Sequence, residues 1–154
     1  MITDFTIVRL VERFMIDLFG ALRNMPASFK HDICQYLKDT TSNVLRLCTK
    51  AMDTPPYDNE LRTVKRNMLI EAHSEAQYLQ VLLCTLNDMS AMSNKVKAGL
   101  DMQLYDIFWN LQRLVGSLNK GIIKNESDAA GAPCSTELNM IETCDCDREG
   151  GSNA

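Results

Sequence analysis

The residue types best suited to chemistry in this chain are its two histidines and the carboxylates beside one of them. His73 lies between Glu71 and Glu75 in the stretch EAHSEA. Metal sites in helical bundles commonly use Glu-x-x-His, in which the two ligands are three residues apart on one helix face. His73 is two residues from each glutamate, which places it about 200° around a helix from Glu71. The spacing argues against a metal site, so no metal ligand is predicted here.

Nucleophilic catalysis is not expected either. A serine or cysteine nucleophile needs a nearby base that a third group holds in place. The second histidine, His31, lies beside Asp32 in the first turn of a predicted helix, which does not supply such an arrangement. The seven glycines are scattered, and none forms a phosphate-binding loop after a strand. We therefore expect no enzyme activity, no catalytic or cofactor-binding residue and no small-molecule substrate.

The six cysteines divide into two groups. Three fall within long helical patterns and are expected to be small buried side chains in a reducing compartment: Cys34, Cys48 and Cys84. The other three lie in a polar C-terminal segment: Cys134, Cys144 and Cys146. The last two are separated by one residue, whereas common zinc sites have a gap of two. A structural metal bound by these three cysteines is therefore the less favoured interpretation.

Composition and charge describe a helical body followed by an acidic tail. The 154 residues are 45% hydrophobic and 23% charged, with only 7 glycines and 4 prolines, which favours helices. No apolar run reaches the roughly 20 residues needed to cross a bilayer, so we expect a cytoplasmic protein without membrane contact. Residues 1–124 contain 15 Lys/Arg and 13 Asp/Glu, whereas residues 125–154 contain 1 and 7. The body is thus mildly basic and the tail acidic.

Apolar residues recur with the helical period in four segments: residues 4–23, 29–51, 59–87 and 94–123. Asn59 is the expected N-cap of the third helix, and the cap of the fourth lies within residues 90–93. The polar stretch 39–43 interrupts the apolar stripe of the second helix. Pro55 and Pro56 indicate a loop, because a residue that precedes proline avoids the helical region.

These elements predict an all-α fold. Four helices of roughly 20 to 30 residues joined by short loops must be neighbours that run antiparallel. We therefore expect an antiparallel up-down-up-down four-helix bundle over residues 1–124. Beyond Lys124 the sequence loses its periodicity, gains Gly and Ser and becomes acidic, which predicts a disordered, flexible tail over residues 125–154.

The predicted helices carry more apolar surface than the interior of one bundle needs. Seven residues extend the stripes sideways: Phe14, Ile16, Phe19, Tyr78, Val81, Phe108 and Trp109. A large aromatic residue such as Trp109 buries about 150 to 250 Å² when it is covered. We therefore expect symmetric self-association with Phe19, Tyr78, Phe108 and Trp109 at the interface. The alternative is that this surface thickens the core of a monomer.

Basic residues are expected to converge at one end of the bundle. They close the second helix and open the third, on either side of a short loop: Arg46, Lys50, Arg62, Lys65 and Arg66. Such a cluster could bind nucleic acid or a protein partner. The small charge excess of the body and the lack of interleaved aromatic residues argue against nucleic acid. The alternative for the three cations of the third helix is an ordinary solvated face.

Several motifs resemble a known family over about residues 5–124. They are Met25-Pro26 between the first two helices, Lys65-Arg66 at the start of the third, Ala72-x-x-Glu75 within it, and the closing segment LVGSLNKGIIK, residues 114–124. This order resembles the small bacterial four-helix-bundle family that includes the accessory variability determinant of diversity-generating retroelements. A related member is encoded within intervening sequences of large-subunit ribosomal RNA.

The resemblance implies a pentameric barrel of four-helix bundles. In that family context, the accessory protein is not a polymerase but partners a retroelement reverse transcriptase and binds its template RNA during mutagenic copying. The functional expectation is therefore a non-catalytic, homopentameric accessory protein that binds the reverse transcriptase and RNA through basic faces. The alternative is a self-assembling protein of the ribosomal intervening-sequence type, whose role is structural or unassigned.

Overall fold

The computed structural model describes residues 5–130, except for the side chains of Lys30 and residues 128–130. Every regular element in this range is a helix, and no strand occurs there. The elements are α1 (Thr6–Arg23), α2 (Ala27–Lys30), α3 (Ile33–Asp53), α4 (Asn59–Asp88) and α5 (Asn94–Ala130). The all-α prediction is therefore confirmed for the described residues.

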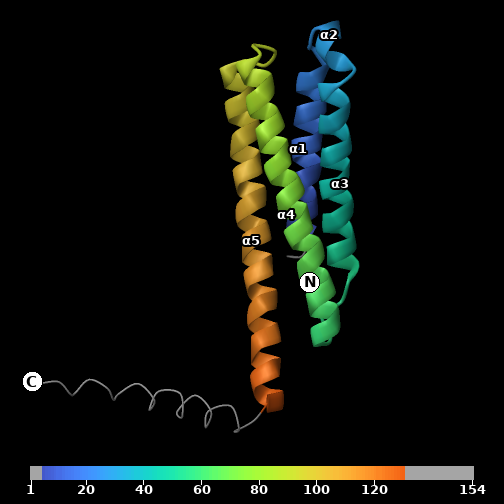
Figure 1. The fold of residues 1–154 in the computed structure, drawn as a ribbon, viewed down its shortest axis with the longest axis vertical. Coiled ribbons are helices and arrows are strands. Elements are labelled where there is room, and N and C mark those ends of the chain that lie inside the picture. The colour runs from blue at the N-terminus through green and yellow to red at the C-terminus, as the bar shows by residue number, and fades with distance from the viewer. Residues whose placement is uncertain (1–4, 131–154) are drawn as a thin grey trace, which may run out of the picture.

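The four long helices lie lengthwise beside one another, and the short α2 sits at one end (Figure 1). The main contacts join α3 to α4, α4 to α5, and α1 to both α3 and α5. Because α1 is shorter than α4 and α5, these two helices continue past its start at the end where the chain leaves α5 (Figure 1). None of the helices within residues 5–130 has the length and apolarity of a membrane span.

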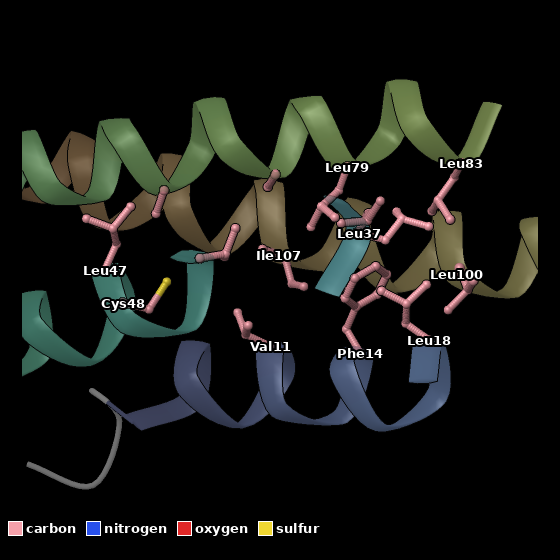
Figure 2. Close-up of a cluster of buried hydrophobic side chains, with 14 of the residues drawn as sticks. Val11, Phe14, Leu18, Leu37, Leu47, Cys48, Leu79, Leu83, Leu100 and Ile107 are labelled. Atoms are coloured by element: carbon pink, nitrogen blue, oxygen red, sulfur yellow. The ribbon is translucent and has the colours of Figure 1, made fainter. Parts of the chain in front are cut away.

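All four long helices contribute side chains to one hydrophobic core. Figure 2 shows Phe14 of α1 in this cluster, together with leucines from α3, α4 and α5. Phe14 is fully buried, so its predicted place at the side of the stripe was wrong. Leu18, Leu37, Leu83 and Leu104 are fully buried as well. A helix pair alone would expose these side chains, so their burial depends on the four helices packing together.

Two buried threonines continue the hydrophobic core across the polar stretch of α3. Thr40 and Thr41 are both buried, although residues 39–43 are polar in sequence. The Thr41 hydroxyl donates a hydrogen bond to the Leu37 carbonyl oxygen of its own helix at 2.7 Å. That bond satisfies the hydroxyl and leaves the methyl group to pack, so the stripe continues without an unpaired polar atom at Thr41.

The N-caps of α4 and α5 lie at or within one residue of the predicted positions. The loop before α4 is present, but the N-cap of α4 is Asp58 and not Asn59. An Asp58 carboxylate oxygen accepts a hydrogen bond from the Leu61 backbone N–H at 2.8 Å. Ser93 acts in the same way for α5, where its Oγ accepts from the Val96 N–H at 3.3 Å. The predicted cap within residues 90–93 is thus confirmed.

The last helix runs further than the sequence pattern indicated. α5 ends at Ala130, so residues 125–130 belong to the helix and not to a flexible tail. Asn125 helps to fix this extension, because its amide nitrogen donates a hydrogen bond to Asn59 Oδ1 at 3.1 Å. The rest of the predicted acidic tail, residues 131–154, lies outside the described residues, as do its three cysteines.

The Asp58 cap gives a direct test of how α4 begins. Replacing Asp58 with Ala removes an acceptor for a backbone N–H of the first helical turn, and we expect the free energy of unfolding to fall by about 1 kcal/mol. Urea denaturation followed by circular dichroism would measure this loss. Asp88→Ala is a matched control at the last residue of α4, where a negative charge opposes the helix dipole and its removal costs no stability.

Candidate interaction surfaces

The five basic residues predicted to form a cluster do not have the same environment. Arg46 and Lys50 are exposed on α3, as expected for residues that could meet a partner. Lys65, in contrast, is only 7% exposed and lies on the buried face of α4. The alternative interpretation of Lys65 as part of a solvated face is therefore wrong, since the stem of this side chain fills space in the bundle.

The two arginines of α4 are engaged with neighbouring side chains near the far end of α5. Arg66 Nη1 donates a hydrogen bond to Asn119 Oδ1 of α5 at 3.2 Å, and Arg62 Nη1 donates to Asn59 Oδ1 at 3.3 Å. A Cβ on Gly121 would lie 3.4 Å from Arg62 Nε, so this glycine lets the guanidinium approach α5 closely. Both arginines thus help to join α4 to α5 where α1 no longer covers them.

The four aromatic residues predicted at an oligomer interface also differ in exposure. Phe19 and Phe108 are partly buried against the core, and the Lys38 ammonium lies 5.7 Å from the centre of the Phe19 ring. Tyr78 is 47% exposed and Trp109 is 59% exposed. The side chains of Tyr78 and Trp109 are therefore available to a partner, whereas Phe19 and Phe108 pack partly against the core of their own protomer.

The fold gives His73 a place that sequence spacing did not predict. Its ring packs at a tilt against Phe108 of α5, with a centroid separation of 5.2 Å. Within the described part of the chain, no group of three or more His, Cys, Asp or Glu side chains could hold a metal ion. His31 is exposed at the break between α2 and α3. His73 is thus a packing residue between α4 and α5.

Two hollows lie along the boundary between α4 and α5. The first, which we call the Gly116 hollow, has a volume of about 310 Å³ and is lined by Ile70, His73, Ser74, Leu111, Gln112, Val115, Gly116 and Asn119. The second, the Trp109 hollow, has a volume of about 380 Å³ and is lined by His73, Gln77, Gln80, Tyr105, Phe108, Trp109 and Gln112. Because they share His73 and Gln112, the two hollows form one α4–α5 groove.

The turn between the two helices positions this groove. Ser90 adopts a positive φ of 58°, and the Ala91 N–H donates to the Leu86 carbonyl oxygen at 2.9 Å. This arrangement ends α4 sharply and allows α5 to return along it. The groove therefore depends on a turn that the sequence located only as a cap region.

The α4–α5 groove combines aromatic and amide side chains, and no Lys, Arg, Asp or Glu lines it. Tyr105 is 73% exposed and Trp109 is 59% exposed, which is unusual for large aromatic residues that no partner covers. Tyr105, Gln77 and Gln112 were missed as site residues. The spacing of Tyr105 and Trp109 by four residues, off the apolar stripe of their helix, was the signal that could have found them.

The three described cysteines differ in environment. Cys34 and Cys48 are buried, and the Cys34 thiol donates to the Met25 sulfur at 3.6 Å. Burial raises the pKa of Cys48 from 9.0 to about 12. Cys84 is half-buried beside Lys97, whose ammonium lies 2.6 Å from Asp101 Oδ2. The pKa of Lys97 is raised, first by its hydrogen bond to Asp101.

Comparison with known proteins adds no relative. No protein-family model, curated protein or solved structure matches this chain.

The buried Cys48 thiol predicts a stability change at high pH. The pKa of the Cys48 thiol is higher in the folded chain than in the unfolded chain. The stability that this thiol contributes is therefore retained below pH 9.0 and is lost as pH rises toward about 12. Between these values the stability advantage over Cys48→Ala should narrow by up to about 1.4 kcal/mol per pH unit. Urea titrations from about pH 8 to about pH 11 would measure it.

The control for this experiment is Val44→Ala, which removes a buried side chain that does not titrate. The stability difference between the native chain and this variant should not depend on the Cys48 proton. If the stability difference between the native chain and Cys48→Ala also stays constant with pH, the assignment of a buried neutral thiol is contradicted.

Proposed function

We propose that this chain is a non-catalytic accessory protein that works as a homo-oligomer of antiparallel four-helix bundles. Two features support the antiparallel arrangement. In Figure 1 the colour gradient runs in opposite directions along successive long helices. The connections between those helices are short, as in up-down-up-down bundles. The oligomer acts in the cytoplasm, where reducing conditions keep its cysteines as thiols.

The observation that carries the proposal is the exposed aromatic and amide surface of the α4–α5 groove. The cores of protein–protein interfaces are depleted in charge and enriched in aromatic residues. The groove has both properties, and Tyr105 and Trp109 expose most of their side-chain surface beside it. A surface of this kind supports a protein that functions through binding to other protein chains.

The resemblance to the retroelement accessory family supplies the proposed partners, a reverse transcriptase and its template RNA. Arg46 and Lys50 are the basic residues best exposed for this contact, since Arg62 and Arg66 are hydrogen-bonded to neighbouring side chains. Several copies in one oligomer would add their weak positive fields, and such a field attracts RNA without reading its sequence.

A second candidate is a self-assembling bundle of the ribosomal intervening-sequence type with a structural role. The burial of Lys65 favours it, because the cluster then offers fewer free cations to a nucleic acid than the sequence predicted. Under this candidate the protein would assemble with itself and show no salt-dependent affinity for RNA.

RNA binding by variants of the purified protein separates the two candidates. We expect an affinity that falls steeply with salt, and Arg46→Gln combined with Lys50→Gln should lower the slope of log affinity against log salt by about one to two units. Fluorescence anisotropy of a labelled template RNA would measure it. Co-purification with the co-expressed reverse transcriptase tests the protein partner separately.

Arg9→Gln combined with Arg13→Gln is the matched control, because these two exposed cations are also one turn apart, on α1. This pair should leave the slope unchanged. Equal effects of both pairs would indicate a general loss of charge, and an absence of RNA binding would favour the second candidate.

A further inference from the structure

We infer that two copies of this chain pack face to face through the α4–α5 groove, with Trp109 of each copy inserted into the Gly116 hollow of the other. This inference rests on the self-association in the proposed function, and it assigns the surface, the symmetry and the anchoring residue of that contact. The structural basis is that a projecting side chain and an unfilled hollow lie on the same face of the molecule.

Trp109 and Gly116 are seven residues apart on α5, which is about 10 Å along the helix and about 20° around it. They therefore share one stripe of the helix surface. A two-fold axis that crosses this stripe near Gln112 would place each Trp109 over the partner's Gly116. Residues exchanged in this reciprocal way define an isologous interface. Gln112 already lines both hollows, as a residue at the midpoint should.

The Gly116 hollow has the size and lining to receive an indole ring. Its volume is about 310 Å³, and Ile70, Leu111 and Val115 provide apolar surface within it. A Cβ built on Gly116 would meet no atom within 4 Å, so the space above this glycine is open. Burying a tryptophan there would remove about 150 to 250 Å² from water, which is the scale of an interface anchor.

The charge pattern favours a second copy of this chain over RNA as the occupant. None of the side chains that line the two hollows belongs to Lys, Arg, Asp or Glu, so these residue types create no like-charge repulsion when the hollows meet their own copy. Gln77, Gln80 and Gln112 each carry a donor and an acceptor, and such groups pair with themselves across a two-fold axis. RNA would need cations here to match its phosphates.

Two cations adjoin the groove, and both are already engaged. Arg66 donates a hydrogen bond to Asn119, which lines the Gly116 hollow. The Arg113 guanidinium lies 5.6 Å from the centre of the Trp109 ring, and its Nη2 donates to Asn110 Oδ1 at 3.4 Å. Arg113 thus flanks one side of the indole and orients it. Along α5 the groove extends from Tyr105 to Asn119, which is about 21 Å of helix. A face of that length and two helix diameters wide covers roughly 400 Å² per partner, so a contact of standard size, about 800 Å² per partner, extends beyond the groove onto the adjoining surfaces of α4 and α5.

The test fills the hollow without disturbing the protomer. Gly116→Leu introduces a side chain into open space and improves the helix propensity of α5, so the protomer should fold. We expect it to weaken the dimer by at least about 30-fold, as for the loss of a tryptophan anchor. Gly20→Leu is the matched control, because Gly20 is also a helical glycine with open space, on α1. It should dimerise like the native chain.

Trp109 is the only tryptophan of the chain, so its fluorescence reports on the same contact. Emission of the native protein should shift to the red as dilution separates the copies and exposes the ring. Gly116→Leu should show the red-shifted emission at every concentration. Analytical ultracentrifugation of the same samples would give the stoichiometry, which should be an even number of copies and not the five that the family resemblance implies.

An exchange of the two positions provides the sharpest check. Trp109→Ala and Gly116→Trp should each weaken association alone, whereas the double variant Trp109→Ala/Gly116→Trp should regain it. The reason is that the two-fold axis still places the large side chain opposite the small one. Circular dichroism would establish that each variant folds. Failure of the double variant to regain association, when it is folded, overturns the inference.

The outcomes separate this inference from the proposed function. The two-fold contact is overturned if Gly116→Leu leaves the oligomer intact, or if the oligomer is a pentameric ring with head-to-tail contacts. Either outcome leaves the self-association of the proposed function standing. A native protein that stays monomeric at high concentration overturns both. Quenching of Trp109 by RNA in a monomer would show that nucleic acid is the occupant, and it would likewise overturn the inference.

Discussion

Burial of one apolar core among four helices is the constraint on which the rest of this structure depends. Helices of this kind gain most of their stability from packing an apolar face, because propensity alone is marginal in water. Leu18, Leu37, Leu83 and Leu104 are fully buried, and each comes from a different helix. The positions of all outward side chains follow from this packing, since burying one face of a helix decides which residues remain on the other.

Unequal helix length explains why polar contacts gather at one end of the molecule. α1 has 18 residues and α5 has 37, so the core narrows where α1 is missing. There the helix pair α4 and α5 is joined by hydrogen bonds of Arg66 and Asn125, and Gly121 admits the Arg62 guanidinium. Cations that would otherwise face solvent are thereby used to hold the protomer together.

The α4–α5 groove shows how a helix can serve two purposes. One stripe of α5 supplies the core residues Leu104 and Leu111, while another carries Tyr105 and Trp109 at the surface. No Lys, Arg, Asp or Glu lines the groove, so its lining contains none of the lysines and arginines that pair with the phosphates of a nucleic acid. The groove also suits contact with an identical surface, because uncharged amide side chains do not repel one another. The fold and the proposed assembly therefore use separate faces of the same helices.

The sequence by itself determined the helical class, the loop at Pro55 and the approximate helix limits, because periodicity and turn chemistry are local properties. It did not determine which apolar or basic residues are exposed. Phe14 and Lys65 became buried against the prediction, because burial depends on the rotation of each helix against its neighbours, whereas the exposure of Trp109 agrees with its predicted place at the side of the stripe. Tertiary structure alone brought His73 to Phe108 and opened the hollow at Gly116, since both require α5 to lie along α4 in one register.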